Sequence, residues 1–236
     1  MKANRDYYDD FAGWYERERH HGYHAMIDRL QVGVARPLCL NRDVLEVGCG
    51  TGLILKEIEP FARKAVGLDL SRGMLGQARA RGLTVVEGSA TDLPFADGSF
   101  DAVYSFKVLA HVQAIEKAMS EVARVLRPGG KAALEFYNTT SLRYLIKRLK
   151  RPHAVSDQTT DDQVYTRYDS LADVKRYLPD TLKIDQLHGI RVFTPFAQVH
   201  QVPGVRHAFG AAERFARDRR LTARLGGFLV VVVERV

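Results

Sequence analysis

The stretch from Val44 to Gly52, Val-Leu-Glu-Val-Gly-Cys-Gly-Thr-Gly, decides how the rest of the chain is interpreted. Its first residues form a short apolar run, which is typical of a buried parallel strand. Three alternating glycines follow, and apolar residues resume at helical spacing after Gly52. The pattern predicts a strand, a glycine-rich turn and a helix. Such a turn lets a ligand approach the backbone, and the helix N-terminus offers it free N–H groups.

The spacing of the glycines separates this turn from two common phosphate-binding loops. The dinucleotide fingerprint would require glycine at position 53, where Leu53 stands, and a phosphate loop would require a lysine after Gly52. Glu46 instead places a carboxylate at the end of the strand. That charge would repel a pyrophosphate but suits a ligand that carries an ammonium group. On this motif alone, an ordinary strand-to-helix turn remains the alternative.

A second apolar strand, residues 65–69, ends in Asp69 and is followed by Ser71, a residue type that favours helix N-caps. Asp69 lies about twenty residues beyond the glycine turn, where doubly wound folds place the carboxylate that binds ribose hydroxyls. Together the two stretches resemble the first motifs of the class I S-adenosylmethionine-dependent methyltransferases. The family pattern Gly-x-Asp-x-Ser-x-x-Met-Leu is matched by Gly67, Asp69, Ser71, Met74 and Leu75.

This resemblance implies a fold, a cofactor and a set of site residues. The fold is α/β, with a Rossmann-like, seven-stranded, mostly parallel sheet, helices on both faces and helical lid insertions. The cofactor is S-adenosyl-L-methionine, and the product formed from it is S-adenosyl-L-homocysteine. The cofactor-binding residues that the resemblance implies are Tyr15, Glu46, Gly48, Cys49, Gly50, Asp69, Leu70, Met74, Ser89, Ala90 and Phe106.

Two further strands are predicted at residues 83–87 and 100–106. The segment between them resembles the family stretch Gly-Asp-Ala-x-x-Leu-Pro-Phe-x-x-x-x-Phe-Asp, which holds the adenine. Ser89 replaces the aspartate that commonly accepts a hydrogen bond from the adenine amino group. The Ser89 hydroxyl can still accept a hydrogen bond, the Ala90 backbone N–H can still donate one, and Asp92 is a second candidate acceptor.

His111 follows the fourth strand within Phe106–Val112. Residues that leave the carboxyl end of a strand in an open parallel sheet border the ligand crevice. Imidazole can remove a proton near neutral pH, so we predict His111 as the catalytic residue, acting as a base. A histidine that only packs or forms a hydrogen bond at the crevice edge is the alternative.

The remaining elements follow from periodicity and stop signals. An amphipathic helix is predicted at 114–126, and Arg-x-Leu-Arg-Pro-Gly-Gly from Arg124 closely matches the family's turn into a fifth strand at 132–137. The resemblance ends there. Beyond it we predict a basic helix at 141–151, a polar loop at 156–163, a helix near 169–177, a strand within 182–193, a helix at 211–219 and a central buried strand at 226–233.

The 236 residues fit one methyltransferase domain, although two compact domains are also allowed. We divide it into an N-terminal helical cap (1–36), a cofactor-binding core (37–138) and variable substrate or lid insertions (139–181 and 194–225). Aromatic residues at helical spacing form a stripe in the cap. Most such stripes are core or docking surface, but the family resemblance makes Tyr8 and Tyr15 candidates to touch cofactor or substrate.

Composition limits the class of protein. Hydrophobic residues make up 46% and charged residues 27%, as in soluble globular proteins. We found neither an apolar run near the roughly 18 residues of a membrane span nor a signal-peptide pattern, so the cytoplasm is expected. Cys39 and Cys49 provide no disulfide framework. His20, His21 and His24 lack the context of a zinc site. We predict no metal.

The net charge of +7 allows nucleic acid, an acidic small molecule or an anionic membrane surface as partner. Arg143, Lys147 and Lys150 recur at helical spacing in the basic helix, with apolar residues between them. We interpret them as a solvated basic face on a lid helix. A site for an acidic substrate or an anionic lipid is the alternative. Nucleic acid is not expected, because no exposed aromatic platform accompanies these charges.

The sequence therefore predicts methyl transfer to an oxygen, nitrogen or carbon nucleophile of a small organic acceptor, of quinone or natural-product type. A homodimer is allowed. One rival function is a tRNA or rRNA methyltransferase, which an Asn/Asp-Pro-Pro-Tyr motif after the fourth strand would support; Ser105–Val108 stands there instead. The other rival is a non-catalytic cofactor-binding protein, which would bind the cofactor without turnover.

Overall fold

The computed structural model describes residues 22–149, 154–156, 159–160, 165–194, 196, 198–199, 202 and 204–236. Its strands are β1 (Asp43–Val47), β2 (Lys64–Asp69), β3 (Val85–Glu87), β4 (Phe100–Ser105), β5 (Leu126–Tyr137), β6 (Ala154–Ser156), β7 (Thr159–Thr160), β8 (Leu182–Ile190) and β9 (Phe228–Arg235). Its helices are α2 (Gly22–Cys39), α3 (Leu53–Ile58), α4 (Arg72–Ala80), α5 (Ile115–Val125), α6 (Leu142–Leu149), α7 (Leu171–Tyr177), α8 (Val205–Arg217) and α9 (Arg220–Ala223), with short 3-10 turns η1 (Glu59–Phe61) and η2 (Leu109–His111).

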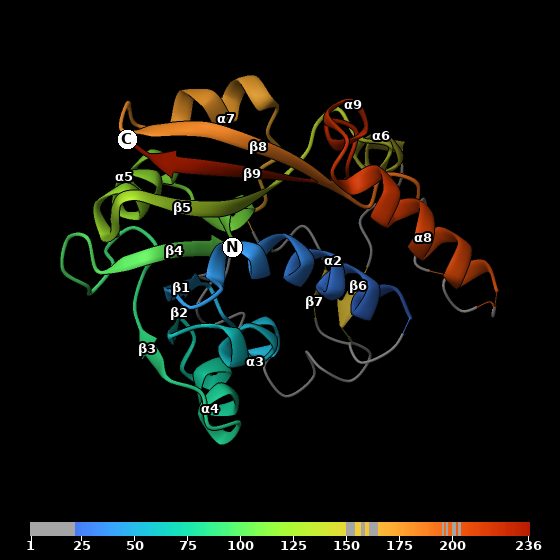
Figure 1. Ribbon diagram of the computed structural model, residues 1–236. Coiled ribbons are helices and arrows are strands. Elements are labelled where there is room, and N and C mark those ends of the chain that lie inside the picture. Colours follow the sequence, from blue (N-terminus) through green and yellow to red (C-terminus); the bar gives the residue numbers. More distant parts are fainter. Residues whose placement is uncertain are drawn as a thin grey trace.

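Seven of the strands form one sheet in the order β3-β2-β1-β4-β5-β9-β8. Neighbouring strands from β3 to β5 pair in parallel, whereas β9 lies antiparallel between β5 and β8. Figure 1 shows this sheet running through the molecule, with β3 at one edge and β8 at the other. The predicted Rossmann-like, mostly parallel sheet of seven strands is therefore confirmed.

Helices cover both faces of the sheet. Successive side chains of a strand point to opposite faces. Leu45 and Val47 of β1 accordingly belong to a hydrophobic cluster with α5 and α7. Val44 belongs to a second cluster with α2 and α3. Burial on both faces explains why these strands are nearly continuous apolar runs.

The strand order reverses at β1, which lies between β2 and β4. Ligands of open α/β sheets bind at such a switch point, outside the carboxyl ends of the strands. The parallel strands end at Val47, Asp69, Ser105 and Tyr137, and the antiparallel β9 begins beside Tyr137 with Phe228. We call this side of the sheet the carboxyl edge and the opposite side, where these parallel strands begin, the amino edge.

Some predicted boundaries were wrong. Only Val85–Glu87 forms the third strand, because Leu83 is buried with α3 and α4 rather than paired in the sheet. A small hairpin of β6 and β7 begins at Ala154, just before the polar loop predicted at 156–163, and overlaps it. The helix predicted at 211–219 starts earlier, at Val205, because Gly210 is buried inside it instead of interrupting it.

The helix α2 is part of the core and runs past the predicted end of the cap at residue 36. Its buried residues Met26, Ile27, Leu30 and Val34 recur every three or four positions and pack in the α2–α3 cluster. The aromatic stripe with Tyr8 and Tyr15 lies outside the described residues. Among the helices of the described segments, none is both long and apolar enough to cross a membrane.

Candidate active site

The glycine-rich turn connects β1 to α3, and its glycines have positive φ angles of 78° at Gly48, 54° at Gly50 and 82° at Gly52. A Cβ at Gly48 would lie 2.2 Å from a methyl of Val108, and one at Gly52 would lie 2.3 Å from a methyl of Leu83. At Gly50, no atom of the described residues lies within 4 Å of the Cβ position. The turn is thus packed at its two ends and open at its centre, where a ligand can reach the backbone.

Asp69 connects the second predicted motif to the first. Its Oδ2 accepts a hydrogen bond from the Gly50 N–H at 2.7 Å, and its Oδ1 accepts one from the Ser71 N–H at 2.9 Å. A carboxylate has about four acceptor sites, so an oxygen that receives one backbone N–H can also accept a ligand hydroxyl. Ser71 caps α4, as predicted, by accepting from the Met74 N–H. The two motifs are therefore in direct contact.

Glu46 is 3% exposed and accepts a hydrogen bond from the Tyr104 hydroxyl at 3.1 Å. Burial raises the pKa of Glu46 well above its usual range, against the lowering effect of the Tyr104 hydrogen bond, and the negative charge of Asp69 raises it further. A cation bound nearby would favour the ionised carboxylate. The group therefore suits a positively charged ligand, as the sequence predicted, and disfavours a phosphate.

The Cys49 side chain points into the sheet rather than toward the open turn. A Cβ on Gly67 would lie 2.7 Å from Cys49 Sγ, and burial raises the pKa of this thiol. The Cys49 N–H donates to Leu68 O at 2.9 Å, so its backbone also helps hold the turn on β2. Cys49 can contribute to a ligand site only through its backbone.

The other predicted contacts differ in accessibility. Phe106 is buried in the α2–α3 cluster, where its ring centroid lies 5.6 Å from that of Tyr104. Met74 is buried on α4. Leu70 is 42% exposed directly after Asp69. Of these predicted side chains, Leu70 is therefore the one placed to cover a ligand at the carboxyl edge.

Ser89 and Ala90 follow β3 at the same edge. The Ser89 hydroxyl accepts from the Thr91 N–H at 3.2 Å and lies 2.8 Å from Thr91 Oγ1. The Asp92 N–H donates to Ser89 O, which closes a tight turn. The Ser89 hydroxyl thus stabilises its own loop, and Asp92 is exposed beside it.

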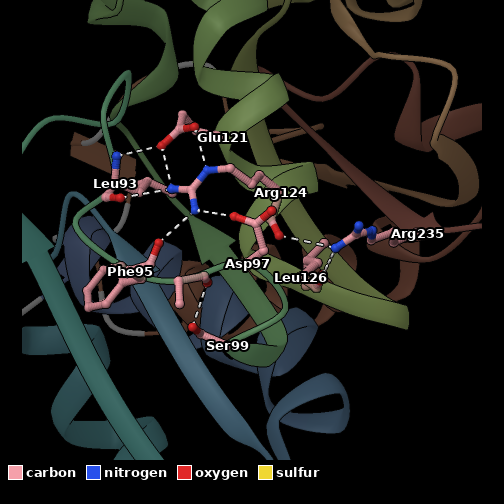
Figure 2. A network of polar contacts seen from close by, with 9 residues as sticks. Leu93, Phe95, Asp97, Ser99, Glu121, Arg124, Leu126 and Arg235 are labelled. Carbon is pink, nitrogen blue, oxygen red and sulfur yellow. Dashed lines mark hydrogen bonds and ion pairs between the residues drawn. The ribbon is translucent and has the colours of Figure 1, made fainter.

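Arg124 of α5 fixes the Leu-Pro-Phe segment that follows this turn (Figure 2). Its guanidinium donates to Leu93 O at 2.9 Å and to Phe95 O at 2.7 Å, and it pairs with Asp97 at 2.8 Å. Glu121 binds the same guanidinium through both oxygens at 2.8 Å and accepts from the Leu93 N–H at 2.7 Å. The segment predicted to border adenine is therefore held from α5 by charge-assisted hydrogen bonds.

These residues fit an adenosine-type cofactor that carries a positive charge. The space above Gly50 is open, Asp69 can accept from ribose hydroxyls, and Glu46 lies buried in the strand before the turn. Thr51 Oγ1, in the turn itself, is buried with no hydrogen-bond partner among the described residues. Acidic groups and open backbone line the turn on the side of Gly50 and Asp69, and Arg81 donates to Thr51 O at 3.0 Å.

His111 ends the 3-10 turn η2 beyond β4. Its Nδ1 lies 2.9 Å from Tyr165 O and 3.3 Å from Thr166 Oγ1. Because a carbonyl oxygen only accepts, this contact assigns the proton to Nδ1 and makes Nε2 the nitrogen that can take up a proton. The imidazole also meets the Tyr137 ring edge-on, with centroids 5.7 Å apart. The structure brings His111 to the carboxyl edge in the tautomer that a base acting at Nε2 requires.

Sequence reasoning missed the segment that holds η2. The Arg167 N–H donates to Ala110 O at 2.7 Å, and its guanidinium donates to Val112 O at 2.6 Å and Leu109 O at 3.0 Å. The same guanidinium pairs with the buried Asp169 at 2.7 Å. A lone arginine in an irregular segment gave no sequence signal for this role.

Glu135 of β5 is a second buried carboxylate near the edge. It accepts from Gln31 Nε2 at 2.6 Å and from the Lys107 N–H at 3.0 Å, and burial raises its pKa, against the lowering effect of the Lys107 charge. Lys107 has a φ of 62°, which is uncommon for a residue with a side chain, and its Nζ binds Asp28 at 2.6 Å. These contacts stabilise the turn that carries the chain from β4 toward His111. A glutamate inside an apolar strand was the available signal.

Three predictions concern residues or ligands that the structure does not test. Tyr15, His20 and His21 lie outside the described residues. Among the residues that are described, no group of three or more His, Cys, Asp and Glu side chains is arranged to hold a metal ion. Metal-free cofactor binding remains a prediction.

Residues 45–134 match the family model described as a methyltransferase domain. A protein of Mycolicibacterium smegmatis, named a probable S-adenosylmethionine-dependent methyltransferase, is 40% identical over 94 residues, or 39% of this chain and 37% of that protein. A demethylmenaquinone methyltransferase of Mycolicibacterium paratuberculosis is 35% identical over 155 residues, or 62% of this chain and 65% of that protein.

The fold likeness extends further along the chain than the sequence likeness. The crystal structure of an S-adenosylmethionine-dependent methyltransferase from Thermotoga maritima aligns with a TM-score of 0.70 over 98% of this chain and 99% of that chain, at 18% identity. At this low identity the likeness shows a shared fold, and the family model identifies residues 45–134 as a methyltransferase domain. The alignments span only 37% and 65% of the two curated relatives described above.

Proposed function

We propose that the protein transfers a methyl group from S-adenosyl-L-methionine to an oxygen, nitrogen or carbon nucleophile of a small organic acceptor. The observation that carries this proposal is that the open turn at Gly50, the Asp69 carboxylate and His111 all lie at the carboxyl edge of the sheet. When bound, the cofactor supplies an electrophilic sulfonium methyl group. The chain therefore has to bind and orient the nucleophile rather than activate the methyl group.

Each part of the carboxyl edge has a role in this proposal. Asp69 accepts hydrogen bonds from the ribose hydroxyls, and the buried Glu46 stabilises positive charge near the turn. The Ser89 loop and the segment fixed by Arg124 border the adenine. Removing any of these contacts would weaken cofactor binding without directly changing the nucleophile.

His111 is the proposed base. Its Nδ1 is held by Tyr165 O, so Nε2 takes the proton from an acidic acceptor hydroxyl or an enol. A positioned base contributes about 10²–10⁴-fold in rate. Holding the nucleophile in an attacking geometry contributes roughly 7–11 kcal/mol. His111 therefore adds to positioning and does not replace it.

The 35% sequence identity to a demethylmenaquinone methyltransferase supports a small acceptor of quinone or natural-product type. The residues at the end of β4 and just after it, Ser105–Val108, do not form the Asn/Asp-Pro-Pro-Tyr motif that would support a nucleic-acid methyltransferase. We therefore favour a small molecule over tRNA or rRNA. A homodimer stays a prediction.

Two measurements test the proposal in sequence. Calorimetry with S-adenosyl-L-methionine and S-adenosyl-L-homocysteine should give binding without added metal and in the presence of a chelator. The protein should then transfer label from the cofactor to a component of a small-molecule cell extract, which mass spectrometry identifies. Cofactor binding without labelling of any component would favour the non-catalytic alternative, and labelling of RNA alone would favour the nucleic-acid alternative. Absence of cofactor binding would contradict the proposal.

A further inference from the structure

The sequence predicted that Arg143 lies on a solvated face of the basic helix. The structure instead packs its side chain against the sheet. Ser141 fixes the start of α6, because its hydroxyl donates to Asn138 O at 2.7 Å and accepts from the Tyr144 N–H at 3.1 Å. Arg143 packs on Gly227 just before β9, where an added Cβ would lie 3.1 Å from Arg143 Cδ. Arg148 on the same helix is exposed and does match the prediction.

The guanidinium of Arg143 is surrounded by aromatic rings. Its Cζ lies 4.5 Å from the Tyr137 ring centroid, 4.6 Å from that of Phe228 and 5.9 Å from that of Tyr168. These rings attract a cation, but their faces are poor substitutes for an oxygen acceptor. The Nη1 atom is buried and has no hydrogen-bond partner among the described residues. A buried charged donor without a partner is costly, so the site favours an added acceptor.

The charges around Arg143 also favour an anion. Although burial acts to lower it, the pKa of Arg143 is raised, and Tyr137, Tyr168 and Tyr23 raise it more than the nearby carboxylate of Glu135 does. The Glu135 oxygens accept from Gln31 and the Lys107 N–H. Arg191 provides a second cation nearby. Burial lowers the pKa of Arg191, and repulsion by the Arg143 charge lowers it further. Two guanidinium groups therefore make this part of the carboxyl edge positive.

The Tyr137 ring connects this positive region to the proposed base. Arg143 lies over the ring, and the His111 imidazole meets it edge-on. We propose that Arg143 recognises a carboxylate on the acceptor, and that the acceptor is a small organic acid whose nucleophile lies beside His111. The planar guanidinium matches the geometry of a carboxylate. This inference rests on the proposed function and narrows it to one class of acceptor.

The test uses a pair of probes that differ in charge and variants that differ in one cation. The probes are 4-hydroxybenzoate and its uncharged amide, 4-hydroxybenzamide, titrated by NMR into the full-length protein saturated with S-adenosyl-L-homocysteine. The parent protein should prefer the acid by about tenfold or more, as expected for a charged hydrogen bond. Arg143→Met should abolish this preference, Arg143→Lys should retain part of it, and the control Arg148→Met should retain all of it.

A second experiment uses the unknown acceptor itself. A small-molecule extract is separated by anion exchange into neutral and acidic fractions, and each is incubated with labelled cofactor. Label should enter the acidic fraction, and Arg143→Met should lower this labelling at least tenfold. The affinity of Arg143→Met for S-adenosyl-L-homocysteine and its midpoint of thermal unfolding should stay near those of Arg148→Met.

The inference is overturned if label enters only the neutral fraction, or if Arg143→Met is as active as the parent protein. Equal affinity for the two probes, or no binding of either at millimolar concentration, also counts against it. Loss of folding in both Arg143 variants assigns the residue to structure instead. All these results leave cofactor binding intact in the parent protein. Failure of the proposed function is recognised separately, because the parent would then bind no S-adenosyl-L-homocysteine.

Discussion

The two edges of the same sheet manage charge in opposite ways. At the amino edge, oppositely charged side chains form ion pairs near the surface. Arg63 pairs with Asp43 at 2.7 Å, and Arg127 pairs with Asp101 at 2.7 Å and with Asp43 at 3.1 Å. At the carboxyl edge, Glu46, Glu135 and the Nη1 atom of Arg143 are buried. Incompletely compensated charges gather where a ligand is expected, whereas the opposite edge carries stability.

The strongest test of this division compares two histidines. His111→Ala should lower turnover by roughly 10²–10⁴-fold, because the proposed base is lost. The affinity for the cofactor should change little, because the proposed cofactor-binding residues are retained. The control His188→Ala removes a histidine of the edge strand β8 that pairs with Asp218, and it should leave turnover unchanged. Steady-state rates on one acceptor, measured from pH 5 to 9, decide it.

The rising limb of that pH profile should disappear with His111, because the base must lose its proton before it acts. A rate loss of tenfold or less with an unchanged profile would restrict His111 to positioning. Equal losses of rate in His111→Ala and His188→Ala would show that the effect is not specific to His111.

The next effect concerns cofactor affinity. Asp69→Ala removes the acceptor of the Gly50 and Ser71 N–H groups together with the proposed ribose contact. Charged hydrogen bonds contribute roughly 1.5–3 kcal/mol, so the affinity should fall by about 10- to 150-fold in calorimetry. The matched carboxylate Asp185, which pairs with Lys131 outside this edge, should give no change as Asp185→Ala. Unaltered affinity in Asp69→Ala would contradict the assignment of the turn.

A substitution that loosens the segment proposed to border the adenine should change the stability of the protein more than its activity. Arg124→Ala removes donors to Leu93 O and Phe95 O and leaves Glu121 without its main partner. We expect a loss of about 1–3 kcal/mol in the free energy of unfolding, measured with denaturant. Arg72→Ala, which removes an exposed pair with Glu87, should cost less than about 1 kcal/mol. A similar loss in both would mean that the network adds nothing beyond surface pairing.

The smallest effect is a difference in the sign of the pH dependence. Arg63, acting chiefly by hydrogen bonding, lowers the pKa of Asp43 to about 2, against about 3.9 in unfolded chains. Its stabilising contribution is present above pH 4 and is lost as the pH falls toward 2. Burial raises the pKa of Glu46 and Glu135 instead, so their contribution is present below about pH 4.3 and is lost as the pH rises.

Unfolding free energies measured at several pH values would separate the two contributions. Asp43→Asn should flatten the rise in stability between about pH 2 and 4, whereas Glu135→Gln should flatten the decline above about pH 4.3. Glu135→Gln also keeps an oxygen to accept from the Lys107 N–H. If Glu135→Gln steepened the decline, the buried carboxylate would be ionised more easily in the folded protein than we infer.

The carboxyl edge could be predicted from sequence where local patterns specify it. Gly50 and Asp69 lie in short strand–turn–helix units, whose apolar runs, glycines and caps are visible within a few residues. His111 could be placed because it follows a recognisable strand. Each of these assignments depends on neighbours in the chain.

Arg143 could not be placed in this way. Its orientation depends on Gly227 and Phe228, more than 80 positions later, which the antiparallel pairing of β9 with β5 brings under α6. Helical periodicity assigns charges to a face but does not say which face meets a distant strand. Arg167 was missed for a related reason, since it holds the η2 turn through the backbone carbonyls of Leu109 and Val112, which carry no side-chain signature.

The position of β9 also has a consequence during synthesis. Tyr137 of β5 pairs with Phe228 of β9, so about 90 residues must be translated before β5 gains this neighbour. At about 5–20 residues per second, the growing chain spends roughly 5–18 s with the β5 edge uncovered by β9. Such an edge can pair with another chain, and pairing over so long a separation is slow. Nascent chains stalled between residues 140 and 225 should therefore depend most on chaperones.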